Sequence, residues 1–144
     1  MADSIPSRIQ LEIATPEKQV VREPVEAVTL PGKEGYLGVL PGHAPLLSEL
    51  QPGEIVYTTS LGERYLAVSW GFAEVLPERV IVLAETSELA GEIDVARAER
   101  AKERAEERLK RPNEANVDAE RARSALARSM ARLRVASHRT GGDK

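Results

Sequence analysis

The side chains best suited to chemistry in this sequence are arginines near its C-terminal end. Between residues 121 and 139 there are six arginines and no aspartate or glutamate. The six are Arg121, Arg123, Arg128, Arg132, Arg134 and Arg139. A guanidinium group stays protonated at physiological pH and forms paired hydrogen bonds to carboxylates and phosphates. A run of such groups without neighbouring acids favours an acidic protein surface or a polyanion as its partner.

Groups that could support catalysis are few. The chain has no cysteine, which excludes disulfides, thiolate metal ligands and cysteine nucleophiles. Its two histidines, His43 and His138, have no histidine partner four residues away and no carboxylate arrangement typical of a metal site. Gly32-Lys33 is followed by Glu34 instead of serine or threonine, so it is not a phosphate-binding P-loop. We therefore expect no catalytic residue and no metal site in this chain.

The composition divides the chain into two parts. All five aromatic residues and eight of the nine prolines precede residue 78, whereas residues 92–139 contain no aromatic residue and no glycine. Residues 1–90 carry 6 Lys and Arg against 13 Asp and Glu, a net charge of −7. Residues 91–144 carry 14 against 10, a net charge of +4. We expect two domains, residues 1–90 and 91–144, with charges of opposite sign.

The first part is predicted to be an antiparallel β-sandwich. Ile9, Leu11 and Ile13 alternate with polar residues, which is the pattern of a strand with one buried face. Similar runs follow, separated by Pro and Gly turns that are too short to hold a helical crossover. The expected strands are residues 9–13, 25–30, 54–59, 64–70, 72–76 and 79–84.

The second part is predicted to be an antiparallel hairpin of two helices. No glycine or proline falls between Asp94 and Arg111, and Asp94 can cap the first turn. Pro112 interrupts the helical pattern, and Asp118 is a second candidate cap. The apolar positions on both helices are mostly alanine, which buries little surface. The hairpin is therefore expected to detach easily from the sandwich.

Nothing in the sequence predicts a membrane span. No uninterrupted apolar run approaches the ~20 residues that cross a bilayer. The first four residues, Met-Ala-Asp-Ser, do not resemble the start of a secretory signal peptide. We expect a protein that is neither secreted by a standard signal nor integral to a membrane.

Several motifs, in order along the chain, resemble the ε subunit of bacterial F-type ATP synthase. Residues 35–47 read GYLGVLPGHAPLL, and Gln-Pro-Gly follows at 51–53. Residues 67–75 read AVSWGFAEV and residues 80–84 read VIVLA, before the helical part. The resemblance implies an α+β fold, a β-sandwich followed by two helices, without catalytic activity of its own. It also implies a rotor subunit of the central stalk at the cytoplasmic face of the cell membrane, attached peripherally through the complex.

The same resemblance implies partners for each part. The sandwich would bind the γ subunit and the c-ring, and the hairpin would contact the α and β subunits and inhibit ATP hydrolysis. The residues implied at γ and the c-ring are Lys33, Glu34, Tyr36 and His43. The residues implied against the β subunits are Arg121, Arg123, Arg128, Arg132 and Arg134.

A further motif resembles the ATP site of some ε subunits. Residues 93–98, IDVARA, match the pattern I/L-D-x-x-R-A. The implied ATP-binding residues are Glu88, Ile93, Asp94, Arg97, Ala98, Arg104, Arg128 and Arg132. Arginines seven apart on one helix and four apart on the other share a face, so in an antiparallel hairpin all four could converge on a triphosphate. ATP would then be a regulatory ligand, with no cofactor required; the alternative is a solvated helix whose arginines pair with its own glutamates.

A nucleic-acid-binding module is the second functional alternative. The arginine-rich second helix would supply phosphate contacts. The helices lack stacking aromatic residues, and the sandwich is acidic. We therefore prefer a subunit that binds no nucleic acid.

Overall fold

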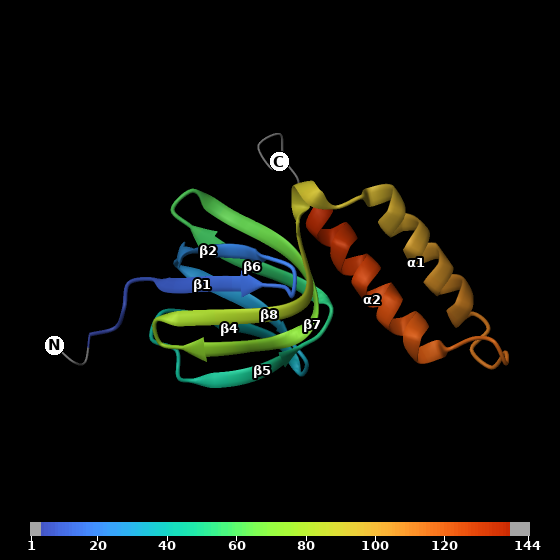
Figure 1. Cartoon of the computed structure of the whole chain (residues 1–144), viewed down its shortest axis with the longest axis horizontal. Helices are drawn as coiled ribbons and strands as arrows, with labels where there is room; N and C mark the ends of the chain where they lie inside the picture. Colours follow the sequence, from blue (N-terminus) through green and yellow to red (C-terminus); the bar gives the residue numbers. More distant parts are fainter. Residues whose placement is uncertain (1–3, 139–144) are drawn as a thin grey trace.

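The computed structural model describes residues 4–138, which form a β-sandwich with a helical hairpin docked at one end (Figure 1). The predicted fold class is confirmed. The strands are β1 (Ile9–Ala14), β2 (Gln19–Val25), β3 (Ala27–Gly32), β4 (Gly35–Val39), β5 (Leu46–Leu50), β6 (Gly53–Thr59), β7 (Gly62–Leu76) and β8 (Arg79–Leu89). A short 3-10 turn, η1 (Ala90–Glu92), leads to the helices α1 (Val95–Leu109) and α2 (Ala119–Ala136).

Hydrogen bonding joins all eight strands. The order is β2-β1-β8-β7-β5-β3-β4, and β6 pairs with both β3 and β7. Since β5 also pairs with β3 and with β7, the ladder closes around one end of the sandwich. Seven of the eight pairings are antiparallel, while β1 and β8 run parallel, which differs from the purely antiparallel expectation. The sandwich interior is filled by the alternating apolar residues of these strands, with Ile9, Leu11 and Ile13 fully buried.

A bend in β7 lets one strand serve both halves of the sandwich. Residues 62–68 pair with β6, residues 71–75 pair with β5, and β8 pairs along the other edge from residue 66 to residue 76. Trp70 has a positive φ of 47° and Gly71 a φ of 144°. A Cβ on Gly71 would lie 2.0 Å from the Leu83 carbonyl oxygen, so only glycine fits there. The sequence predicted two strands, 64–70 and 72–76, where the structure has one bent strand.

Two other strand expectations were wrong. The expected strand 25–30 is divided at Glu26, whose backbone N–H donates to the Thr58 carbonyl at 2.8 Å, so that β2 ends and β3 begins with a different partner. The buried residues Val25 and Val28 are three apart, which breaks the two-residue period of a single strand. The strands β2, β4 and β5 were not predicted, because their residues show no regular alternation of apolar and polar types.

Both helices of the hairpin begin at the predicted aspartates. The Asp94 carboxylate accepts a hydrogen bond from the Arg97 backbone N–H at 3.0 Å, and the Asp118 carboxylate accepts one from the Arg121 N–H at 3.1 Å. These two caps are confirmed. The predicted cation Arg139 lies outside the described residues.

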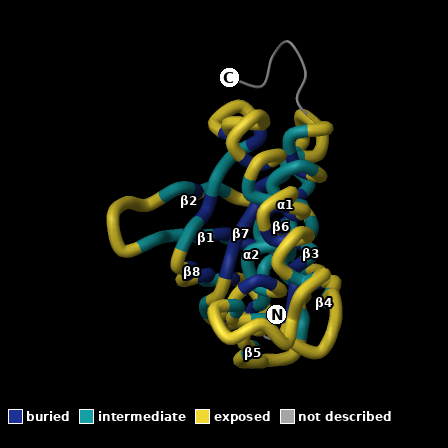
Figure 2. The backbone as a smooth tube through the Cα atoms, turned by 90° about the vertical axis from the view of Figure 1, so that its right-hand side faces the viewer, coloured by how far each residue is buried: buried dark blue, intermediate teal, exposed yellow. Residues whose placement is uncertain are grey.

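The helix α2 lies between the sandwich and α1 (Figure 1). It packs on β6 and β7, and α1 packs mainly on α2. A small apolar cluster of Ala67, Ala90, Ile93 and Val135 joins the helix to the sandwich, with Tyr65 and Ala136 packed against it. The helix α1, on the outside of the hairpin, is largely exposed, whereas the central strands are buried (Figure 2).

Candidate functional site

A polar cavity of about 300 Å³ opens where η1 and the two helices meet the sandwich. It is lined by Glu88, Glu92, Asp94, Arg97, Ala98, Ala101, Arg104 and Arg132. Six of the eight residues implied for ATP binding are in this lining, while Glu92 and Ala101 were not anticipated. Its volume is at the lower end of the ~300–1,000 Å³ typical of small-molecule sites.

The three arginines of the cavity come from both helices. Arg97 and Arg104 lie on one face of α1, as their spacing of seven predicts, and Arg132 approaches from α2. Within residues 4–138, neither Arg97 nor Arg104 forms an ion pair. Two guanidinium groups therefore line the cavity without a carboxylate partner, which suits an anionic ligand.

The three carboxylates of the cavity are already engaged. Asp94 caps α1, and Glu88 accepts a hydrogen bond from Arg132. Glu92 accepts from the Leu89 backbone N–H at 2.9 Å and pairs with Lys18 at 3.5 Å. Three arginines and three acids give the lining a formal charge of zero. Because the lining has no net positive charge, a polyanion would be attracted only by the local positions of the arginine side chains.

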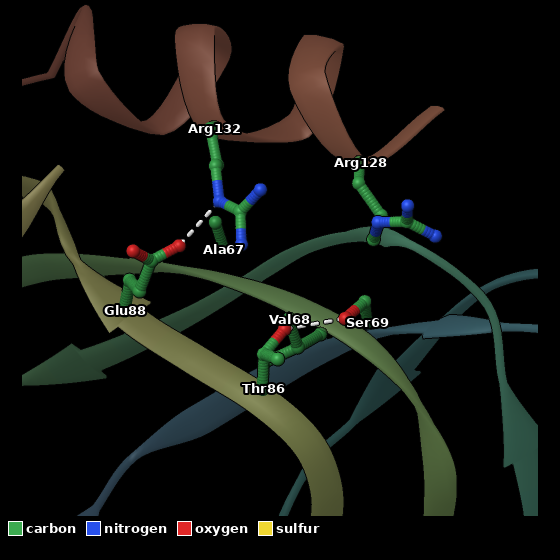
Figure 3. A pocket seen from close by; sticks show the side chains of 7 residues that line it. All are labelled: Ala67, Val68, Ser69, Thr86, Glu88, Arg128 and Arg132. Carbon is green, nitrogen blue, oxygen red and sulfur yellow. Dashed lines mark hydrogen bonds and ion pairs between the residues drawn. The ribbon is translucent and has the colours of Figure 1, made fainter. Parts of the chain in front are cut away.

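Two of the implied residues lie outside this cavity. Ile93 is buried in the apolar cluster beneath α2 and supports the helix instead of facing the cavity. Arg128 lines a narrow neighbouring pocket, together with Ala67, Val68, Ser69 and Thr86 (Figure 3). The two hollows share Glu88 and Arg132, so Arg128 stands one helical turn from the cavity's edge.

When α2 is docked, the arginines implied for inhibition fall into an exposed group and a half-buried group. Arg121, Arg123 and Arg134 are exposed, and Arg123 pairs with Glu120 at 2.7 Å. Arg128 and Arg132 are half-buried and face the sandwich (Figure 3). The docked helix therefore does not present one continuous basic face, which disfavours the nucleic-acid alternative.

The residues implied for γ and c-ring contact lie on the sandwich. Lys33, Glu34 and Tyr36 line a surface hollow of about 410 Å³ between the β3–β4 hairpin and β5. Lys33 pairs with Glu49 at 3.0 Å, and the Tyr36 hydroxyl accepts a hydrogen bond from the Glu54 backbone N–H at 3.2 Å. His43 is not part of this hollow; its Nδ1 lies 2.7 Å from the Ala44 carbonyl oxygen in the loop after β4.

An exposed apolar patch on the outer face of β7 and β8 was missed. Phe72 lies directly opposite Leu83, and both side chains are exposed, by 51% and 59%. Trp70, at the bend in β7, is 38% exposed. The signal was available, because alternation within the strands places these residues on the solvent face, where polar residues are expected.

Within residues 4–138, no group of three His, Asp or Glu side chains is placed to hold a metal ion. No helix in the described part of the chain is long and apolar enough to cross a membrane.

The fold and the site define a small two-domain protein in which a helical hairpin closes a polar cavity against a β-sandwich. A family model described as ATP synthase, Delta/Epsilon chain, beta-sandwich domain matches residues 8–90. A second model, described as the long alpha-helix domain of the same chain, matches residues 92–137. The chain therefore belongs to the ATP synthase delta/epsilon family, and its function is that of an ATP synthase epsilon subunit.

Individual relatives agree with this assignment. The ATP synthase epsilon chain of Koribacter versatilis is 57% identical over 109 residues, covering 76% of this chain and 74% of the relative. The epsilon chain of Syntrophobacter fumaroxidans is 50% identical over 129 residues, covering 90% and 96%. A chain in the cryo-EM structure of the Euglena gracilis mitochondrial ATP synthase, OSCP/F1/c-ring, superposes with a TM-score of 0.81 at 28% identity, covering 96% of this chain and 86% of that one.

Proposed function

We propose that this chain is a non-catalytic subunit of the central stalk whose hairpin restrains ATP hydrolysis and responds to bound ATP. The sandwich binds the γ subunit and the c-ring, and the hairpin, when released, reaches the α and β subunits. The protein is held at the cytoplasmic face of the membrane only through the complex. The Euglena gracilis complex that contains a similar chain also includes a c-ring, which supports this place in the assembly.

The observation that carries the regulatory proposal is the cavity lined by Arg97, Arg104 and Arg132. It exists only when α1, α2 and the sandwich are together, because each contributes part of the lining. A ligand that binds there stabilises the docked form by its differential affinity for the two conformations. ATP, with three linked phosphates, matches three guanidinium groups at the cavity wall. Bound ATP therefore favours the docked, non-inhibitory hairpin.

The sandwich offers two surfaces to its partners. The hollow lined by Lys33, Glu34 and Tyr36 includes charged side chains, which suit the polar loops of the c-ring. The patch of Trp70, Phe72 and Leu83 suits the γ subunit, because exposed apolar patches commonly mark protein interfaces. The same sheet face carries Glu49 beside Phe72, so a basic rim on the partner would complement the patch.

Calorimetry on the isolated full-length protein tests the nucleotide site. We expect ATP to bind the wild type, and Arg97→Ala or Arg104→Ala to weaken binding by about tenfold or more, since each removes a charge-assisted hydrogen bond. Arg100→Ala is the matched control, because Arg100 is on the same helix, is exposed and does not line the cavity. Absence of binding at millimolar ATP, or equal losses in Arg100→Ala, would refute the site.

A further inference from the structure

The end of α2 and the turn that follows it are fixed to the sandwich by two specific contacts. The Nε of Arg132 donates to the Glu88 Oε1 of β8 at 2.5 Å (Figure 3). Six residues further on, the His138 ring lies flat over the ring of Tyr65 in β7, with centroids 3.7 Å apart and planes inclined by 3°. One contact is ionic and the other is aromatic, and they reach two different strands.

A buried valine lies between these two contacts. Val135 is 0% exposed and packs in the apolar cluster with Ala67 and Ala90. Arg132 and Val135 belong to the last turns of α2, and His138 lies in the turn after the helix ends at Ala136, where its backbone N–H donates to the Val135 carbonyl at 3.0 Å. The end of α2 and the turn after it therefore present an ionic, an apolar and an aromatic group to the sandwich, in that order.

The remaining hairpin surface does not duplicate these contacts. Within residues 4–138, the Arg132–Glu88 pair is the one ion pair that joins α1 or α2 to a strand. The buried residues of α1 are two alanines, and this helix packs mainly on α2. Detachment of the end of α2 would thus remove most of the specific attachment of the hairpin.

We propose that Arg132, Val135 and His138 form a clasp that holds the hairpin on the sandwich without any ligand. Bound nucleotide then stabilises the docked state further, but it is not needed for docking. The regulatory role of the clasp rests on the proposed function, because it requires that the hairpin can open. Its physical claim, that these three residues set the resting position of the hairpin, stands apart from ATP binding and from inhibition.

The clasp also gives Glu88 a positioning role. Its carboxylate accepts the hydrogen bond of the Arg132 Nε–H, which leaves the four other N–H groups of the guanidinium available to the neighbouring cavity. The side chains of the pair are 33% and 30% exposed, so solvent screens their attraction only in part. Glu88 therefore acts through Arg132, both on docking and on the geometry of the cavity wall.

The absence of cysteine makes a direct distance measurement clean. Leu61→Cys, 82% exposed at the β6–β7 turn, and Glu120→Cys, with a side chain 83% exposed at the start of α2, would be the only thiols of the labelled full-length protein. Spin labels at these positions report the separation of hairpin and sandwich by pulsed EPR. We expect one narrow distance distribution for the nucleotide-free protein with an intact clasp.

Substitutions in the clasp should shift this distribution. Arg132→Gln and His138→Ala should each raise the ratio of open to docked molecules by about fivefold, and the double variant by about 25-fold if the contacts are independent. His138→Phe keeps a flat ring and should restore docking. Arg134→Gln removes the same charge from an exposed position in the same part of the helix and should leave the distribution unchanged.

The opposite results would overturn the clasp. If the double variant keeps the distribution of Arg134→Gln while circular dichroism shows intact helices, these residues do not hold the hairpin. If the helices of the single variants melt, the exchange of Glu88→Arg with Arg132→Glu decides, because a true clasp regains docking with the charges reversed and a merely structural arginine does not. No nucleotide or other subunit enters this experiment, so its failure is distinct from failure of the calorimetric test.

Discussion

At the scale of single residues, the cavity depends on side chains that have more than one contact. Asp94 both caps α1 and lines the cavity, so its substitution alters the helix start together with the site. Within the described residues, the side chains of Arg97 and Arg104 form no ion pair and no hydrogen bond, which makes them the sharper probes of ligand binding. Functional changes at Asp94 should therefore be read together with a measurement of helix content.

Tyr57 provides a residue-scale prediction about alkaline pH. Burial raises the pKa of Tyr57 to about 12, and the nearby Glu23 carboxylate, which accepts its hydroxyl hydrogen bond at 3.3 Å, adds to the shift. The unfolded chain releases this proton near pH 10, so between about pH 10 and pH 12 it binds fewer protons than the folded chain. The free energy of unfolding is therefore unaffected by this group below pH 10 and falls as the pH rises through that interval.

Urea unfolding at several alkaline pH values tests this expectation. Tyr57→Phe should remove a pH-dependent loss on the order of 2 kcal/mol from the unfolding free energy. Tyr36→Phe, which removes a hydroxyl from an exposed ring, is the control. Identical alkaline slopes in the wild type and Tyr57→Phe would contradict the assignment.

At the scale of elements, the sandwich and the hairpin differ in how they are stabilised. The sandwich encloses a continuous core of large aliphatic side chains and includes all eight strands. The buried residues of the helices are mostly alanine and serine, with Val135 as the largest. Since burial free energy scales with apolar area, the sandwich should be stable alone and the hairpin should not.

A chain truncated after Ala90 tests this difference. We expect cooperative unfolding of the β-sheet signal in circular dichroism and retained capture by the γ subunit, because the core and the Phe72 patch are both intact. Phe72→Glu in the truncated chain should abolish the capture without changing the spectrum. Aggregation of the truncated chain, or γ binding that is lost without the hairpin, would show that the boundary is misplaced.

At the scale of the whole molecule, charge is separated between the two parts. The first 90 residues carry −7 and the rest +4, so docking brings an acidic sandwich and a basic hairpin together. Docking also turns Arg128 and Arg132 toward the sandwich and leaves Arg121 and Arg134 exposed. Opening would expose Arg128 and Arg132 as well, so that all four arginines become accessible to acidic segments of other subunits.

Deletion of residues 91–144 should accordingly raise ATP hydrolysis by the assembled enzyme several-fold, while assembly is retained. The physical reason is that the deletion removes the basic helix but keeps the sandwich surfaces. Hydrolysis rates with and without the deletion, measured at equal content of all subunits, check this expectation. Equal rates under activating and non-activating conditions would exclude an inhibitory hairpin in this protein.

The sequence by itself determined the two-part architecture, the positions of both helices and their aspartate caps. These follow from local properties: alternation in the strands, helix-forming runs without glycine or proline, and capping side chains. The motif at residues 93–98 indicated three of the residues that line the cavity, and the family resemblance indicated Glu88, Arg104 and Arg132 as well. Spacing within one helix was sufficient for Arg97 and Arg104, because helical geometry alone places them on one face.

Only the tertiary structure decided which groups meet across the chain. The bend at Trp70 and Gly71 depends on the close approach of β8, and the division of the strand expected at 25–30 depends on a hydrogen bond to β6. The pairing of Arg132 with Glu88, 44 residues apart, and the stacking of His138 on Tyr65 arise because α2 docks on the sandwich over β6 and β7. Such contacts are set by how complete elements pack, and no local pattern contains that information.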